Sequence, residues 1–219
     1  MRTVRHSWRL AGLGIVLLSL GAVGTASAQQ PAALDSATLA AIAPIVAQAR
    51  AARLPLDPLY ARAREGQLRK VPVPTIEAAV RALAERMQTA NEALAPNPSE
   101  QELRAAADAI KVGIPVETLR AMRKAGKDGS LAVPLGVLTQ LVARGVPVEK
   151  ASMQIVDLLQ RGAVPRNFIA LEESVRQDVL AGRRPDESLD LRLKGIIPNL
   201  PQQATADGLT ATSGPKRPR

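Results

Sequence analysis

The same helix boundary occurs twice in this chain, as GIPVE at residues 113–117 and as GVPVE at residues 145–149. Glycine can end a helix in the left-handed conformation, and proline fits the first turn of the next helix, where its missing N–H costs nothing. The glutamate that follows lies at the positive end of the new helix. The tripeptide AVP at residues 132–134 and 163–165 also precedes an apolar periodic segment. The sequence therefore predicts short helices separated by turns that contain proline.

The spacing of apolar residues predicts an all-α protein of about eight short helices. In the third helix Ile76, Val80 and Met87 share one face, and Ser99 with Glu102 forms a capping box before the fourth. An alternating pattern at residues 189–193 predicts one short extended piece. The helices are expected at about residues 36–52, 57–65 (ending at Gly66), 74–94, 100–112, 116–125, 134–144, 148–161 and 166–181.

A shift of 60 residues aligns two parts of the chain, pairing Leu59 with Leu119 and Gly66 with Gly126. We interpret this register as a duplicated three-helix unit. The alternative is that the pattern of helix, turn and proline recurs without duplication, which would give a similar alignment. The predicted organisation is a signal peptide (1–28), a helical domain (29–182) and a mostly disordered tail (183–219). Within the domain, the two units span about 36–94 and 99–144, and a helical extension spans 147–182.

The first 28 residues predict export. Arg2, Arg5 and Arg9 precede an apolar run at residues 10–23, and residues 26–28 (ASA) form a small-residue cleavage site. The run is shorter than the roughly 20 residues that a membrane-spanning helix needs. We therefore expect cleavage before Gln29, no transmembrane segment afterwards, and a periplasmic or secreted bacterial protein.

Composition excludes several kinds of chemistry from the exported part. The chain has no cysteine and one histidine, His6, which leaves with the signal peptide. Disulfides, thiolate or imidazole metal sites and a Ser-His-Asp triad are thereby excluded. We expect no catalytic residue, no cofactor and no metal. A carboxylate pair, drawn from Glu65 with Glu77 or from Glu172 with Glu173, is the enzymatic alternative. A Ser–Lys pair of Ser152 and Lys150 is disfavoured, because residues two apart on a helix point to different sides.

Charge gives a further hypothesis. The chain carries +9, and removal of the three leader arginines gives 9 − 3 = +6. A basic balance can favour anionic partners, but Arg-rich, Ala-rich composition also follows from the codon bias of a GC-rich genome. Nucleic acid is not expected, because Tyr60 is the only aromatic residue near the basic segment. The candidate anion-binding surface consists of Arg50, Arg53, Arg62, Arg64, Arg69 and Lys70.

One stretch resembles a family of uncharacterised exported bacterial proteins. It comprises ARLPLDPL at residues 52–59, EG at 65–66, KVP at 70–72 and IEAAV at 76–80. The family pattern is G-L-P-x-x-P-L…E-G…K-G-V-P followed by an Ala-rich helix, and Arg53 and Pro72 depart from it. The resemblance covers most of residues 45–165. It implies export and a helical fold, and it implies no activity.

These observations favour a non-enzymatic, exported helical interaction module whose partner is a protein. Stacked helices bury a continuous core and leave a broad face for binding. The alternative is a cationic module that binds an anionic envelope surface or polymer. An enzyme that uses a carboxylate pair is the third hypothesis.

Overall fold

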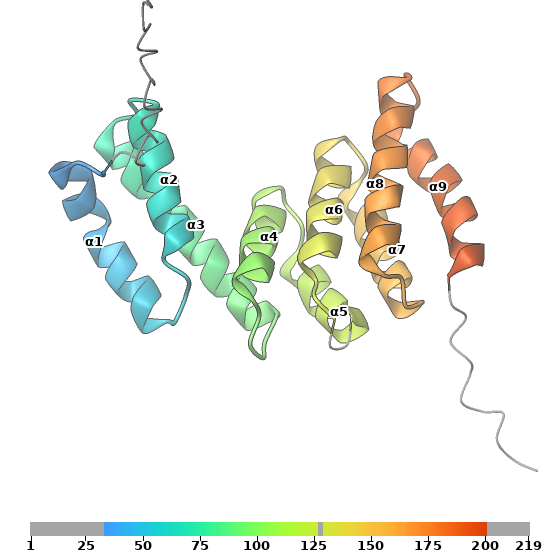
Figure 1. Ribbon diagram of the computed structural model, residues 1–219, viewed down its shortest axis with the longest axis horizontal. Helices are drawn as coiled ribbons and strands as arrows, with labels where there is room; N and C mark the ends of the chain where they lie inside the picture. Colours follow the sequence, from blue (N-terminus) through green and yellow to red (C-terminus); the bar gives the residue numbers. More distant parts are fainter. Residues whose placement is uncertain (1–32, 127–128, 201–219) are drawn as a thin grey trace, which may run out of the picture. The chain divides into compact units, whose positions relative to one another are not determined.

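The computed structural model describes residues 33–126 and 129–200, which form nine α-helices and one 3-10 helix with no β-strand among them (Figure 1). The prediction of an all-α protein with about eight helices is confirmed. The helices are α1 (Ser36–Ala51), α2 (Asp57–Leu68), α3 (Val73–Ala93), α4 (Glu100–Lys111), α5 (Val116–Gly126), α6 (Ala132–Ala143), α7 (Val148–Gln160), α8 (Pro165–Leu180), α9 (Pro185–Ile196) and η1 (Ile197–Asn199).

The sequence predicted that the second helix ends at Gly66. This prediction is wrong, because α2 continues to Leu68. A Cβ on Gly66 would lie 2.7 Å from Cγ1 of Ile76, so glycine is needed there for the close approach of α3. Gly126 does end α5, and a Cβ there would lie 2.6 Å from Cδ2 of Leu131. Both glycines therefore make room for an apolar side chain from the next part of the chain.

Residues 185–196 correct two expectations. They form helix α9, so neither a short extended piece nor a disordered tail beginning at residue 183 describes them. Leu189 and Leu193 are buried and Leu191 is exposed, which is the i, i+4 spacing of a helix. Asp186 and Glu187 lie in the first turn, where carboxylates are favoured. The alternation was ambiguous because residues i and i+4 share a face in both a strand and a helix.

Six helices end in the same backbone motif. In each, an N–H two residues beyond the C-cap donates to a carbonyl five residues earlier, at 2.9–3.1 Å. This is the hydrogen bond of a Schellman motif, and it requires a left-handed residue just before the donor. Four of the six left-handed positions hold glycine and two hold long cations: Gly113, Gly145, Gly162, Gly182, Arg53 and Lys70.

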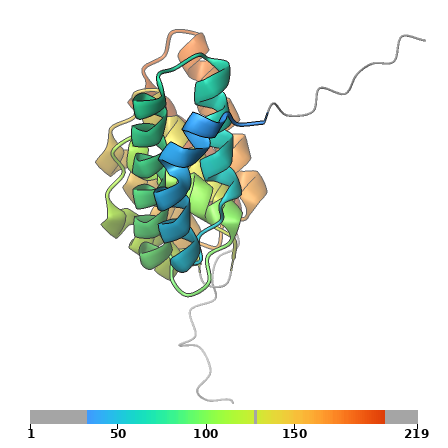
Figure 2. The same ribbon diagram turned by 90° about the vertical axis from the view of Figure 1, so that its left-hand side faces the viewer.

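Helix packing follows two rules. Helices α1, α2 and α3 pack on one another, and α1 lies against the other two (Figure 2). From α3 onward, helices also pack on the helix two positions ahead, which gives the series α3–α5–α7 and α4–α6–α8, and α9 packs on α8. One apolar cluster runs through these helices from Ile42 in α1 to Leu193 in α9. This stacking of successive helices is typical of helical repeat proteins.

The 60-residue register holds in one place and fails in another. Leu59 and Leu119 are both fully buried. Val80 is buried, whereas Gln140, its counterpart, is exposed. In addition, α3 packs on both α4 and α5, across the boundary between the expected units. Duplication of a three-helix unit therefore stays a prediction, for which superposition of residues 44–84 on 104–144 is the test.

The expected signal peptide and the part of the expected tail after residue 200 lie outside the described residues. Among the described helices, none combines the length and the apolar character needed to cross a membrane.

Candidate functional site

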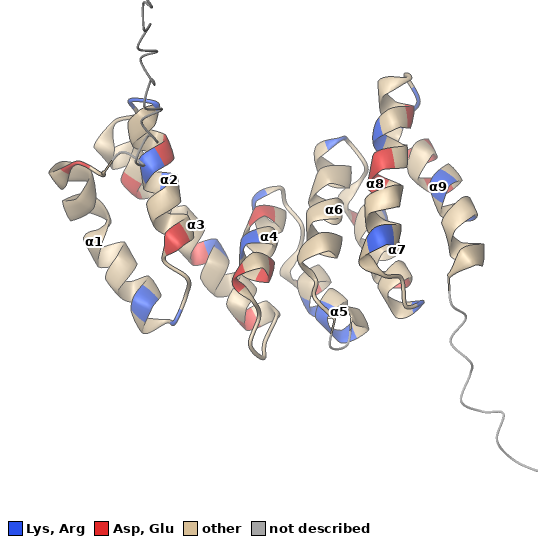
Figure 3. Ribbon diagram, viewed as in Figure 1, with Lys and Arg blue, Asp and Glu red and all other residues tan. Residues whose placement is uncertain are grey.

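The six cations of the candidate surface do not form one patch. Arg50 and Arg53 lie at the C-terminal end of α1, and Lys70 lies beyond the far end of α2. Twelve helical residues span about 18 Å at 1.5 Å each, so Arg53 and Lys70 are at opposite ends of α2. Cations and carboxylates are interspersed along the helices (Figure 3).

Two of the six cations share one carboxylate, which offsets one of their two charges. Glu65 forms ion pairs with Arg62 at 2.8 Å and with Arg69 at 2.9 Å. The hydrogen bond from Arg62, followed by the charges of Arg69 and Arg62, lowers the pKa of Glu65. These pairs lie on the surface of α2, so they contribute little to stability and leave less net charge for a partner.

A polar cleft between α2, α3 and α4 is the most promising site in the described residues. Its volume is about 270 Å³, and Arg62 is the one member of the predicted surface that lines it. The lining holds four cations and two carboxylates, hence a net charge of 4 − 2 = +2. Its residues are Pro58, Ala61, Arg62 and Glu65 of α2, Leu83 and Arg86 of α3, and Arg104, Asp108 and Lys111 of α4.

Arg86 and Lys111 give the cleft its available positive charge. Neither side chain lies within 4.0 Å of a carboxylate among the described residues, whereas Arg62 and Arg104 each have one. The Nε atom of Arg86 is buried and has no hydrogen-bond partner within that same part of the chain. The charge of Lys111 reaches α2, where it contributes to lowering the pKa of Glu65. An arginine in this position can bind a carboxylate or phosphate through two parallel hydrogen bonds.

Sequence reasoning missed most of this cleft. Arg86 comes from α3, which packs on α2, whereas Arg104 and Lys111 come from α4, which packs on α3. One signal was present, since Arg104, Asp108 and Lys111 have the i, i+4, i+7 spacing that places side chains on one face of a helix.

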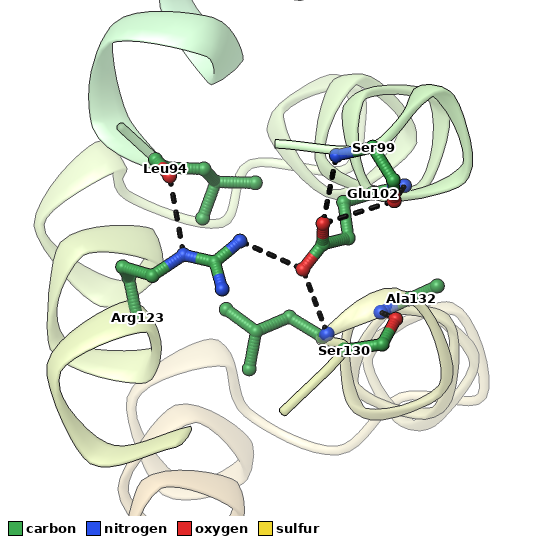
Figure 4. Close-up of polar contacts among 7 residues, drawn as sticks. Leu94, Ser99, Glu102, Arg123, Ser130 and Ala132 are labelled. Carbon is green, nitrogen blue, oxygen red and sulfur yellow. Dashed lines mark hydrogen bonds and ion pairs between the residues drawn. The ribbon is translucent and has the colours of Figure 1, made fainter. Parts of the chain in front are cut away.

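A second polar cluster surrounds Glu102 (Figure 4). Its Oε1 accepts hydrogen bonds from a guanidinium N–H of Arg123 at 2.7 Å and from the backbone N–H of Leu131 at 2.9 Å. Its Oε2 accepts from the backbone N–H of Ser99 at 2.8 Å and from the Ser99 hydroxyl at 2.9 Å. Arg123 also donates to the carbonyl of Leu94 at 3.1 Å. The cluster therefore joins the end of α3 to α4, α5 and the start of α6.

Glu102 is held ionised. Its side chain is only 7% exposed, and this burial opposes ionisation. The backbone N–H groups of Leu131 and Ser99, with further bonds from Arg123 and the Ser99 hydroxyl, outweigh that effect and lower the pKa to about 2. A carboxylate with both oxygens occupied is unsuited to proton transfer near neutral pH, so we interpret this cluster as structural.

The carboxylates of the enzymatic alternative are each paired with an arginine. Glu172 pairs with Arg144 at 2.6 Å, and Glu173 pairs with Arg176 at 2.6 Å. Likewise Glu77 pairs with Arg81 at 2.6 Å, and Glu65 pairs as described above. Glu77 does not line the cleft that holds Glu65. In the described ranges, these groups do not form a site with two free carboxylates.

Among residues 33–126 and 129–200, no group of three or more His, Cys, Asp or Glu side chains is arranged to hold a metal ion. No protein-family model matches the chain, and no curated protein or solved structure shows significant similarity to it.

Proposed function

We propose that this protein is an exported, non-enzymatic interaction module that binds a protein partner through acidic side chains placed in the cleft between α2, α3 and α4. The observation that carries the proposal is the pair Arg86 and Lys111, which have no carboxylate partner among the described residues and line a cleft of net charge +2.

The size of the cleft favours individual acidic groups. A volume of about 270 Å³ is just below the range of small-molecule pockets, and it suits one or two carboxylate side chains. Guanidinium and ammonium groups of the lining would pair with them, and the surrounding helix faces would supply the remaining contact area. The pairing of the alternative catalytic carboxylates with arginines supports a non-enzymatic role.

An anionic envelope polymer is the second candidate. A flat polyanion binds best where many cations share one face, because each neutralised charge adds to affinity. The six cations are spread along α2 and beyond both of its ends, and Glu65 offsets one of the two positive charges on Arg62 and Arg69. This distribution favours recognition of an acidic protein segment in the cleft over binding to an extended polymer.

A pull-down from the envelope fraction tests the proposal. The bait is the exported chain, compared with Arg86→Gln/Lys111→Gln and with the matched control Arg120→Gln/Lys194→Gln. Both double variants lose two positive charges, but Arg120 and Lys194 do not line the cleft. Thermal melts confirm that each variant is folded.

Loss of a captured protein from the cleft variant alone supports the proposal. Equal capture by all three baits contradicts it. Equal weakening of both double variants, together with salt-sensitive retention on an anionic matrix, indicates the polymer alternative, because exposed charges are screened beyond about 8 Å at physiological salt.

A further inference from the structure

Arg53 occupies a backbone position that disfavours its side chain. Its φ is 56°, in the left-handed region, at the end of α1. A Cβ in this region is crowded by the following carbonyl oxygen, and glycine avoids that contact. The matching positions after α4, α6, α7 and α8 all hold glycine. A cation at this position therefore lowers the stability of the turn.

Arg53 lies at the edge of a hollow that is separate from the cleft described above. The hollow has a volume of about 550 Å³ and lies between the α1–α2 turn, the end of α3 and the start of α4. Its polar side chains are those of Arg53, Asn91, Asn97 and Glu100. Its apolar lining comes from Ala52, Leu54, Pro55, Ala95, Pro98 and Leu103.

The polar groups of the hollow have hydrogen-bonding capacity to spare. Within the described residues, no side-chain hydrogen bond or ion pair occupies Arg53, Asn91 or Asn97, and Glu100 has only Arg104 at 3.7 Å. Asn97 is also left-handed, with φ 52°, a conformation that asparagine tolerates. The hollow thus offers one cation, one anion and two amides beside the apolar side chains of alanine, proline and leucine residues.

We propose that this hollow binds a short peptide with free termini, whose carboxylate pairs with Arg53. Guanidinium and carboxylate form charge-assisted, bidentate hydrogen bonds. Glu100 is the complementary group for the peptide's ammonium, and the amides of Asn91 and Asn97 can each donate to and accept from a peptide bond. The apolar lining suits small side chains such as alanine. A volume of about 550 Å³ lies within the range of small-molecule pockets.

Lys70 supplies a matched control within the same chain. It has the same φ of 56° and ends α2 in the same motif, but it does not line the hollow. Replacement of either residue by glycine should relieve the same backbone crowding. Only the replacement of Arg53 should affect the bound peptide.

The test is calorimetric titration of the full chain with the tripeptide Ala-Ala-Ala, in parallel with its C-terminally amidated form. We expect saturable binding of the free tripeptide and a loss of affinity of about tenfold or more on amidation or in Arg53→Gly, as a charged hydrogen bond is lost. Arg53→Gly and Lys70→Gly should both raise Tm by about 2–4 °C, which shows that the binding defect is not a folding defect.

Arg53→Asn provides a second variant, because asparagine tolerates the left-handed position but carries no charge, and it should bind as weakly as Arg53→Gly. Three results would overturn the proposal: no saturation at millimolar tripeptide, equal affinity for the amidated peptide, or equal affinity of wild type and Arg53→Gly. These results do not depend on Arg86 or Lys111, so they are distinguishable from a failure of the proposed function.

Discussion

The Glu102 cluster and the cleft between α2, α3 and α4 use charge in opposite ways. Glu102 is buried, and each of its carboxylate oxygens accepts two hydrogen bonds from neighbouring groups. Arg86 and Lys111 line an open cleft, and neither has a carboxylate partner in the part of the chain that the structure describes. A buried charge that stabilises the fold has all its hydrogen-bond partners within the protein, whereas a charge without such partners is available to bind another molecule. Substitutions and pH changes at the two sites test this contrast.

Removal of the charge on Glu102 should have the largest effect. Glu102→Gln puts an amide NH₂ among groups that donate hydrogen bonds and leaves Arg123 without its anion. We expect a loss of about 3–5 kcal/mol in the free energy of unfolding, as when one partner of a buried pair is removed. Urea denaturation measures it. Glu85→Gln, an exposed carboxylate on α3, should change stability by about 0.5 kcal/mol or less. Similar losses in both variants would contradict the contrast.

Acid should reproduce the same loss in the wild-type protein. The pKa of Glu102 falls from its ordinary value of 4.5 to about 2 on folding. A group whose pKa is lowered on folding contributes its full stabilisation at pH values above its pKa in the unfolded state. That contribution is lost as the pH falls toward its pKa in the folded state. Between pH 4.5 and pH 2, wild type should lose about 3 kcal/mol more than Glu102→Gln, from 1.36 kcal/mol per unit. Parallel stability–pH curves for the two proteins would rule this out.

The left-handed cations should give a smaller effect of opposite sign. Lys70→Gly is expected to stabilise the protein by about 1 kcal/mol, because the crowded Cβ is removed from a turn whose backbone already suits glycine. Thermal unfolding measures the gain. Gly145→Ala, at a glycine of the same motif, should lower the free energy of unfolding by a similar amount, because alanine is strained at the φ of 97° found there. If Lys70→Gly is destabilising, the side chain of Lys70 contributes more than its strain removes.

Substitution in the cleft should have the smallest effect on the free energy of unfolding and the largest effect on partner binding. Arg86→Gln is expected to change the free energy of unfolding by about 0.5 kcal/mol or less, as is usual for a side chain without a specific partner. The same substitution should weaken capture of an acidic partner. Paired urea melts and pull-downs decide the matter. A large loss of stability would place Arg86 with Glu102 as a structural charge.

How much could be predicted from sequence depended on the range of the interactions. Ser99 and Glu102 were recognised as a capping box, because both members lie in one turn. The bonds from Arg123 and Leu131 to the same carboxylate were not predicted, since they come from 21 and 29 residues away. Most helix boundaries marked by proline or glycine were predicted to within one residue, but α6 begins at Ala132, two residues before Pro134. The predicted end of α2 at Gly66 was also wrong, because Gly66 makes room for Ile76 inside the helix.

The candidate site shows the same division. Arg62 was identified from the density of cations in its segment, and the structure places it in the cleft. Arg86 was not identified, because nothing in the local sequence of α3 distinguishes it from the other charged residues of that helix. Its position depends on how α3 packs against α2 and α4, which no local pattern encodes. Residues 185–196 were misjudged because leucine spacing alone does not separate a strand from a helix.

The packing of α4–α8 on near neighbours has a consequence for how the chain assembles. The main packing partners of each helix lie one or two helices away along the chain, so few long loops must close before contacts form. Such low contact order is associated with fast folding, and in stacked helical proteins folding can nucleate at several places and propagate to adjacent helices. The same arrangement would let a helix pair be gained or lost in evolution without rebuilding the core, because only the two junctions with its neighbours would need to be remade.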